Sequence, residues 1–292
     1  MATLTPPLPA TRIELPRLLR LWHLTSLDAV TVAVTWTIAF AWAMHLSLPW
    51  WLPAIVGLSA WSLYIADRLL DARRARTPLR TRHHFHWHHR RIFLPLAVAC
   101  GLTALALVFW KMPVRIEMRD SLIAAAAITY LASVHTAEET SPEHARSRRH
   151  KNWARKELLV ALVFTTACAA PALTRSATRW PLLPLLVVFA ALAWLNCHAI
   201  ESWESVSWES ASRESSRTVR LAAQWLTGLA IAASLAAALL RQQRASLLLL
   251  AAAASALLLL ILDRQRPRLS ETALRTLADL VLLTPLLLVA LP

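Results

Sequence analysis

Glycine is nearly absent from this chain: its 292 residues include only Gly57, Gly101 and Gly228. Wherever helices pack closely, alanine must therefore provide the small side chain. The scarcity also disfavours a transporter, because transporters use helices interrupted by Gly or Pro near the middle of the membrane. Pro171 and Pro184 are the main candidates for such an interruption, and neither has an ionisable partner at the same depth.

Charge is scarce as well. Only 16% of the residues are charged, 57% are hydrophobic and the mean hydropathy is +0.47. A soluble protein of this length would carry more charge. We therefore expect an all-α, polytopic integral membrane protein. Its net charge of +14 fits loops that face anionic membrane lipid better than it fits binding to nucleic acid.

Cysteine is limited to Cys100, Cys168 and Cys197, all in apolar segments, which predicts small core side chains and no disulfide framework. The first 27 residues lack the compact apolar core and cleavage site of a signal peptide. Residues 13–22 are amphipathic and are expected at the membrane interface. We divide the chain into a cytoplasmic amphipathic segment, residues 1–28, and a single transmembrane helical domain, residues 29–292.

Apolar runs long enough to cross a bilayer follow one another along the chain and predict about nine transmembrane helices. Their ranges are 29–47, 49–66, 92–110, 121–135, 157–174, 181–200, 220–240, 245–262 and 272–291. With this topology, 24 of the 31 Lys and Arg residues fall on the N-terminal side of the membrane. The positive-inside bias predicts a protein of the cell (inner) membrane with a cytoplasmic N-terminus and an external C-terminus.

Acidic residues gather where the second apolar run ends. Asp67 and Asp71 are four residues apart, so a helix places both carboxylates on one face. Such a pair repels unless a cation lies between the carboxylates or one takes a proton, and Mg²⁺ suits it. The alternative interpretation is that the two aspartates pair with Arg68 and Arg74 as solvated charges at a helix end.

A second acidic group ends the sixth run. Glu201 and Glu204 share a helix face, and Asn196 lies roughly on the same side. The alternative is that these acids lie at the solvated end of the helix, where the chain continues into an acidic, Ser-rich loop. In the predicted topology both acidic groups emerge on one face of the membrane, together with the cations Arg149 and Lys156. Metal-bridging carboxylates beside cations suit a diphosphate.

With this arrangement the chain resembles the UbiA superfamily of intramembrane prenyltransferases over nearly its whole length. The family's first motif reads N-D-x-x-D-x-x-x-D. The segment from Leu63 to Asp71 matches its last two aspartates, Asp67 and Asp71, while Leu63 and Tyr64 replace the leading Asn and Asp. In the second motif Asn196 fits the start and Glu204 the end, while Ile200 stands at the middle acid with Glu201 beside it.

The resemblance implies nine helices around a central cavity and transfer of a prenyl group from a prenyl diphosphate to a lipophilic acceptor. It implies that Mg²⁺ is held by Asp67 and Asp71, and a second ion by Glu201, Glu204 and Asn196. It also implies that Lys156, with Arg68 or Arg149, binds diphosphate oxygens. A non-catalytic or repurposed lipid-binding member of the fold is the second reading, and a transporter the third.

Two further features concern ionisable groups. Five histidines lie between His83 and His89, which predicts a basic interfacial segment, with a transition-metal site as the alternative. Asp279, in the last apolar run, lies one turn from Arg275, and an ion pair between them would explain both.

Overall fold

The computed structural model describes residues 13–74, 81–114, 125, 129, 142–204 and 209–289. These residues form helices and no strand, apart from an isolated parallel bridge between Ile13 and Leu269. The all-α prediction is therefore confirmed for this part of the chain. The helices are α1 (Arg17–Leu24), α2 (Leu27–Ala43), α3 (Trp51–Arg74), α4 (Thr81–His88), α5 (Arg90–Lys111), α7 (Pro142–Arg175), α8 (Leu182–Glu204), α9 (Glu209–Leu239), α10 (Gln243–Gln265), η1 (Arg266–Arg268), α11 (Glu271–Leu280), η2 (Val281–Leu283) and α12 (Leu286–Val289).

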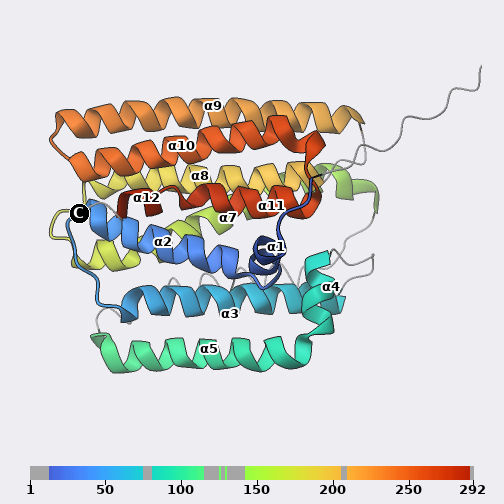
Figure 1. Cartoon of the computed structure of the whole chain (residues 1–292), viewed down its shortest axis with the longest axis horizontal. Coiled ribbons are helices and arrows are strands. Elements are labelled where there is room, and N and C mark those ends of the chain that lie inside the picture. The colour runs from blue at the N-terminus through green and yellow to red at the C-terminus, as the bar shows by residue number, and fades with distance from the viewer. Residues whose placement is uncertain are drawn as a thin grey trace, which may run out of the picture.

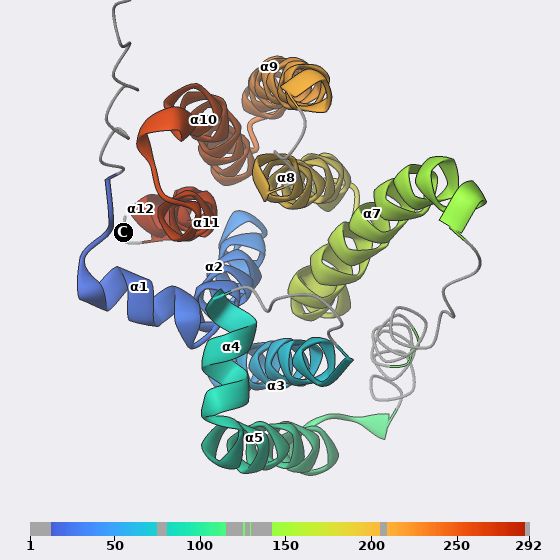
Figure 2. The same ribbon diagram turned by 90° about the vertical axis from the view of Figure 1, so that its right-hand side faces the viewer.

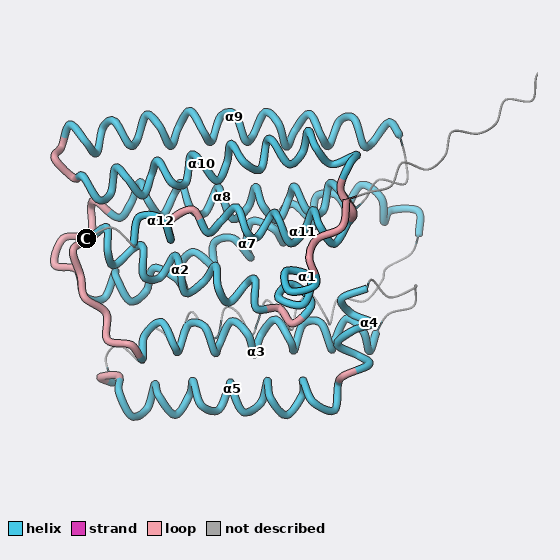
Figure 3. Tube along the Cα trace, in the orientation of Figure 1, coloured by secondary structure: helices cyan, strands magenta, loops and turns pink. Residues whose placement is uncertain are grey.

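The long helices run side by side as a bundle, whereas α1 and α4 lie across one end of it (Figures 1 and 3). The view along the bundle shows α2 surrounded by α3, α7 and the α11–α12 segment (Figure 2). The pairs α9–α10 and α3–α5 pack along their lengths. The expected use of alanine is seen between α9 and α10, where Ala223 and Ala230 of α9 and Ala252 and Ala256 of α10 are all buried.

Among the residues that the structure describes, five helices are long and apolar enough to cross a membrane, or six if α1 and α2, which meet at 81°, count as one bent span. Helices occupy every predicted range except 121–135, most of which lies outside the described residues. The predicted count of nine is not confirmed. The polar end of α3 lowers that helix's hydropathy, and the last predicted span is divided into α11, η2 and α12.

The interruption between α11 and α12 is stabilised from neighbouring helices. Trp36 Nε1 of α2 donates a hydrogen bond to the Leu282 carbonyl at 2.9 Å, and Ser255 Oγ of α10 donates to the Val281 carbonyl at 2.7 Å. The Trp36 ring also stacks on Phe189 of α8, with centroids 4.0 Å apart. Side chains thus satisfy carbonyls that a continuous helix would pair internally.

Candidate functional site

Most of the residues predicted for a site lie toward one end of the bundle. The C-terminal ends of α3 and α8 are both at the end that α1 and α4 cover (Figures 1 and 2). Asp67 and Asp71 occupy the last two turns of α3, and Glu201 and Glu204 the last turn of α8. The α11 helix begins at the same end (Figure 1).

Asp71 pairs with a histidine of the neighbouring helix. Its Oδ2 lies 3.5 Å from His83 Nε2 of α4, and its side chain is 42% exposed. A carboxylate in this position keeps oxygen surface that solvent or a cation can reach. Asp67 is half-buried.

Arg68 turns away from solvent although it lies between the two aspartates in sequence. Its side chain is buried, its Nε donates to Ser26 Oγ at 2.8 Å, and its guanidinium carbon lies 6.0 Å from the centre of the Tyr64 ring. It therefore joins α3 to the turn between α1 and α2. The sequence had assigned it to diphosphate binding.

Asn196 is buried in α8 and donates from Nδ2 to Asp279 Oδ1 of α11 at 3.1 Å. Its own amide oxygen is buried without a hydrogen-bond partner. Glu201 is half-buried, and the side chain of Glu204 lies outside the described part of the structure. Asp67, Asp71 and Glu201 do not join in any compact group of three His, Cys, Asp or Glu ligands among the described residues.

The two cations predicted to bind the diphosphate, Arg149 and Lys156, both belong to α7. Lys156 is half-buried and opens the apolar part of that helix. The side chain of Arg149 lies outside the described part of the structure. Next to Lys156, Glu157 Oε2 is 3.1 Å from His198 Nδ1 of α8, and the His198 ring stacks on Trp194.

The histidine segment from His83 to His88 belongs to α4 and divides into two faces, and His89 precedes α5. His83 and His86 are buried, whereas His84 and His88 are exposed and stack on each other. His86 packs on Phe93 of α5, with ring centroids 4.6 Å apart. Burial lowers the pKa of His86 to about 4. Within the described residues these histidines form no three-ligand metal group.

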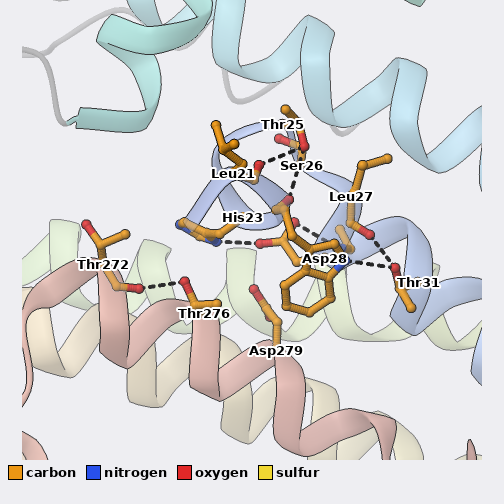
Figure 4. Close-up of polar contacts among 12 residues, drawn as sticks. Leu21, His23, Thr25, Ser26, Leu27, Asp28, Thr31, Thr272, Thr276 and Asp279 are labelled. Carbon is orange, nitrogen blue, oxygen red and sulfur yellow. Dashed lines mark hydrogen bonds and ion pairs between the residues drawn. The ribbon is translucent and has the colours of Figure 1, made fainter. Parts of the chain in front are cut away.

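One compact group of potential metal ligands does occur in the described residues, and the sequence had not indicated it. His23 of α1, Asp28 of α2 and Asp279 of α11 bring ligand atoms within 4.8 Å of one another. His23 Nδ1 contacts Asp28 Oδ2 directly, and Asp279 points toward this pair (Figure 4). His23 and Asp28 are 4% and 1% exposed.

The sharp turn between α1 and α2 creates this arrangement. Ser26, the residue before α2, adopts a left-handed conformation with φ 59° and is fully buried. It turns the chain by 81°, so that His23 folds back onto Asp28. Asp28 Oδ1 also accepts from the Ala29 N–H at 2.8 Å, inside the first turn of α2. This capping satisfies a free helical N–H and suits a negative charge at the helix N-terminus.

A sequence signal for this cluster did exist. Asp28 immediately precedes the first apolar run, 29–47, and Asp279 lies within the last one. Ionisable residues in or beside such segments are typical of functional sites. The predicted Asp279–Arg275 pair stays a prediction. The contact of Asp279 with Asn196 crosses between helices and could not be read from spacing.

Comparison with protein-family models, with curated proteins and with solved structures finds no match to this chain.

Proposed function

We propose that this protein is a UbiA-like membrane prenyltransferase, which moves a prenyl group from a prenyl diphosphate to a lipophilic acceptor with the help of Mg²⁺. The observation that carries the proposal is that the acidic ends of α3 and α8 lie at one end of a bundle of apolar helices (Figure 1). A diphosphate at that end and a prenyl chain among the apolar helices would match this polarity. The proposed topology is nine spans around a central cavity in the cell (inner) membrane, with a cytoplasmic N-terminus and an external C-terminus.

The carboxylates fit Mg²⁺ in their chemistry, since hard oxygen ligands are those it prefers. Asp67 and Asp71 would hold one ion, and Asp71 retains exposed surface. Glu201 and Glu204 would hold a second with Asn196, whose buried amide oxygen lacks a partner. Bound Mg²⁺ would neutralise the diphosphate and make it a better leaving group.

The chain's own cations would bind the diphosphate. Lys156 opens the apolar part of α7, next to the α8 helix that carries Glu201, and Arg149 lies two turns earlier in the same helix. Arg68 would contribute its positive charge through space, since its Nε donates to Ser26 Oγ. Fixed cations of this kind stabilise the negative charge that develops on a departing diphosphate.

A second candidate is a non-catalytic lipid-binding member of the same fold. Two contacts favour it: Asp71 pairs with His83, and Arg68 is bonded to Ser26, so both polar groups have partners within the protein. A shallow apolar groove between α2 and α12, lined by Val30, Val34, Ile38, Leu286 and two threonines, would suit an acyl chain.

The test is equilibrium binding of radiolabelled farnesyl diphosphate to the purified protein in detergent, with Mg²⁺ or with EDTA. We expect Mg²⁺-dependent binding that Asp67→Asn combined with Asp71→Asn abolishes. Glu271→Gln is the matched control, because Glu271 is an exposed acid that opens α11 at the same end of the bundle. Binding that is indifferent to both Mg²⁺ and the double variant would refute the transferase and support the lipid-binding alternative.

A further inference from the structure

We propose that His23, Asp28 and Asp279, together with the amide oxygen of Asn196, form a binding site for one divalent first-row transition-metal ion. This centre shares only Asn196 with the magnesium ligands proposed above, and it does not depend on prenyl transfer. It assigns Asn196 to this ion rather than to a second Mg²⁺. The ion would join helices α1 and α2 near the N-terminus to α8 and to α11, which lies near the C-terminus.

The geometry is close to that of a metal site. Imidazole nitrogens and carboxylate oxygens bind such ions at about 2.1 Å, so two ligands on opposite sides of an ion lie about 4.2 Å apart. The ligand atoms of His23, Asp28 and Asp279 all lie within 4.8 Å of one another. Small rotamer adjustments would bring them to bonding distance, with the His23–Asp28 contact replaced by two bonds to the ion (Figure 4).

The amide of Asn196 provides an independent indication of a ligand. The residue is 6% exposed, it touches Asp279 through Nδ2, and its Oδ1 is buried without a partner. A buried amide oxygen without a partner loses hydrogen-bond energy. Rotation of the amide by 180° would give up the Nδ2–Asp279 hydrogen bond and direct this oxygen toward Asp279, where a cation between the two oxygens would satisfy both. The oxygen and nitrogen of an Asn side chain are assigned from such partners.

The donor set selects the class of ion. Three oxygen ligands and one imidazole nitrogen favour Mn²⁺, Fe²⁺ or Zn²⁺, because imidazole suits transition metals and Mg²⁺ or Ca²⁺ prefer oxygen alone.

Positive charges near the cluster oppose the binding of a metal ion, and this provides a test that distinguishes a metal site from a metal-free cluster. Arg68 and Arg82 lie close enough for their charges to act on His23 and Asp28. If His23, Asp28 and Asp279 form a polar cluster without a metal ion, the positive charge of Arg68 stabilises the cluster, and Arg68→Gln weakens it. If the cluster holds a cation, the same change removes electrostatic repulsion and tightens metal binding.

The experiment uses the full-length protein in detergent, stripped with EDTA and titrated with Mn²⁺. Electron paramagnetic resonance counts the bound ions, and its pulsed form detects nitrogen of a coordinated imidazole. We expect one tightly bound Mn²⁺ per chain with an imidazole signal, displaced by Zn²⁺. His23→Gln should remove the nitrogen signal, and Asp28→Asn with Asp279→Asn should weaken binding by at least about tenfold. Arg68→Gln should strengthen binding.

Two controls separate this site from its neighbours. His84→Gln removes an exposed histidine of α4 at the same end of the bundle and should leave the nitrogen signal intact. Asp67→Asn with Asp71→Asn should abolish Mg²⁺-dependent diphosphate binding and keep the Mn²⁺ signal, so the two proposals fail separately. Folded wild-type protein without imidazole-coupled Mn²⁺, or a nitrogen signal that survives in His23→Gln, would overturn the metal site even if the Asp variants do not fold.

Discussion

Trp36→Phe should destabilise the bundle by removing a single hydrogen bond at the break between α11 and α12. Trp36 is 1% exposed, and its Nε1 is a donor to the Leu282 carbonyl at 2.9 Å. Phenylalanine keeps an aromatic ring against Phe189 but has no donor, so the carbonyl would be buried without this partner. An unsatisfied buried polar group costs about 1–3 kcal/mol, and the lost ring atoms add a cavity cost.

The assay is thermal unfolding in detergent at one scan rate, followed by the loss of monodisperse protein on size exclusion, because membrane proteins often unfold irreversibly. For a chain of this size we expect the apparent midpoint to fall by about 2–4 °C per kcal/mol. Trp225→Phe is the matched control, since Trp225 is 79% exposed on α9 and should change the midpoint little. Equal midpoints for Trp36→Phe and Trp225→Phe would refute the role given to the Leu282 carbonyl.

Three further predictions concern other contacts. Burial lowers the pKa of His86 to about 4, below the unfolded value near 6.5. The contribution of neutral His86 to the free energy of unfolding should therefore be fully present above about pH 6.5 and fall by up to about 3 kcal/mol as the pH drops toward 4. His86→Phe should lack this component of the pH dependence. Gly57→Leu should disrupt the α2–α3 contact, because a Cβ at Gly57 would meet Val34 at 3.0 Å, whereas Gly228→Leu has open space and should be tolerated; thermal unfolding compares the two. Asp263→Ala should cost about 1–3 kcal/mol in the same assay by removing the acceptor of Trp203 Nε1.

Each of these has a clear contrary result. Identical acid denaturation curves for His86→Phe and wild type would mean that protonation of His86 does not oppose folding. Equal midpoints for the two glycine variants would contradict the close approach of α2 and α3. Wild-type stability in Asp263→Ala would show that the buried carboxylate of Asp263 makes no net contribution to the stability of the folded protein.

The all-α class and the positions of most helices followed from the sequence. Scarce charge and long apolar runs are local properties, and they determine which segments can cross a bilayer. The break between α11 and α12 was not visible in the apolar run 272–291. It depends on Trp36 and Ser255, which lie on other helices and supply the hydrogen bonds that the interrupted backbone needs.

The polar end of the bundle was partly predictable. Spacing correctly placed Asp67 and Asp71 at the end of one helix and Glu201 at the end of another. Spacing could not reveal that Asp71 pairs with His83, or that Arg68 is bonded to Ser26, because both contacts depend on how α4 and α1 lie across the bundle.

Sequence alone determined the apolar, basic, helical character of the chain and the ends of helices where acids collect, since these are properties of consecutive residues. Only the tertiary structure brought His23, Asp28, Asn196 and Asp279 together. Their meeting requires the left-handed turn at Ser26 and the packing of α11 beside α2 and α8. Which faces of distant helices meet is determined by packing across the whole bundle, and the periodicity of one segment does not contain that information.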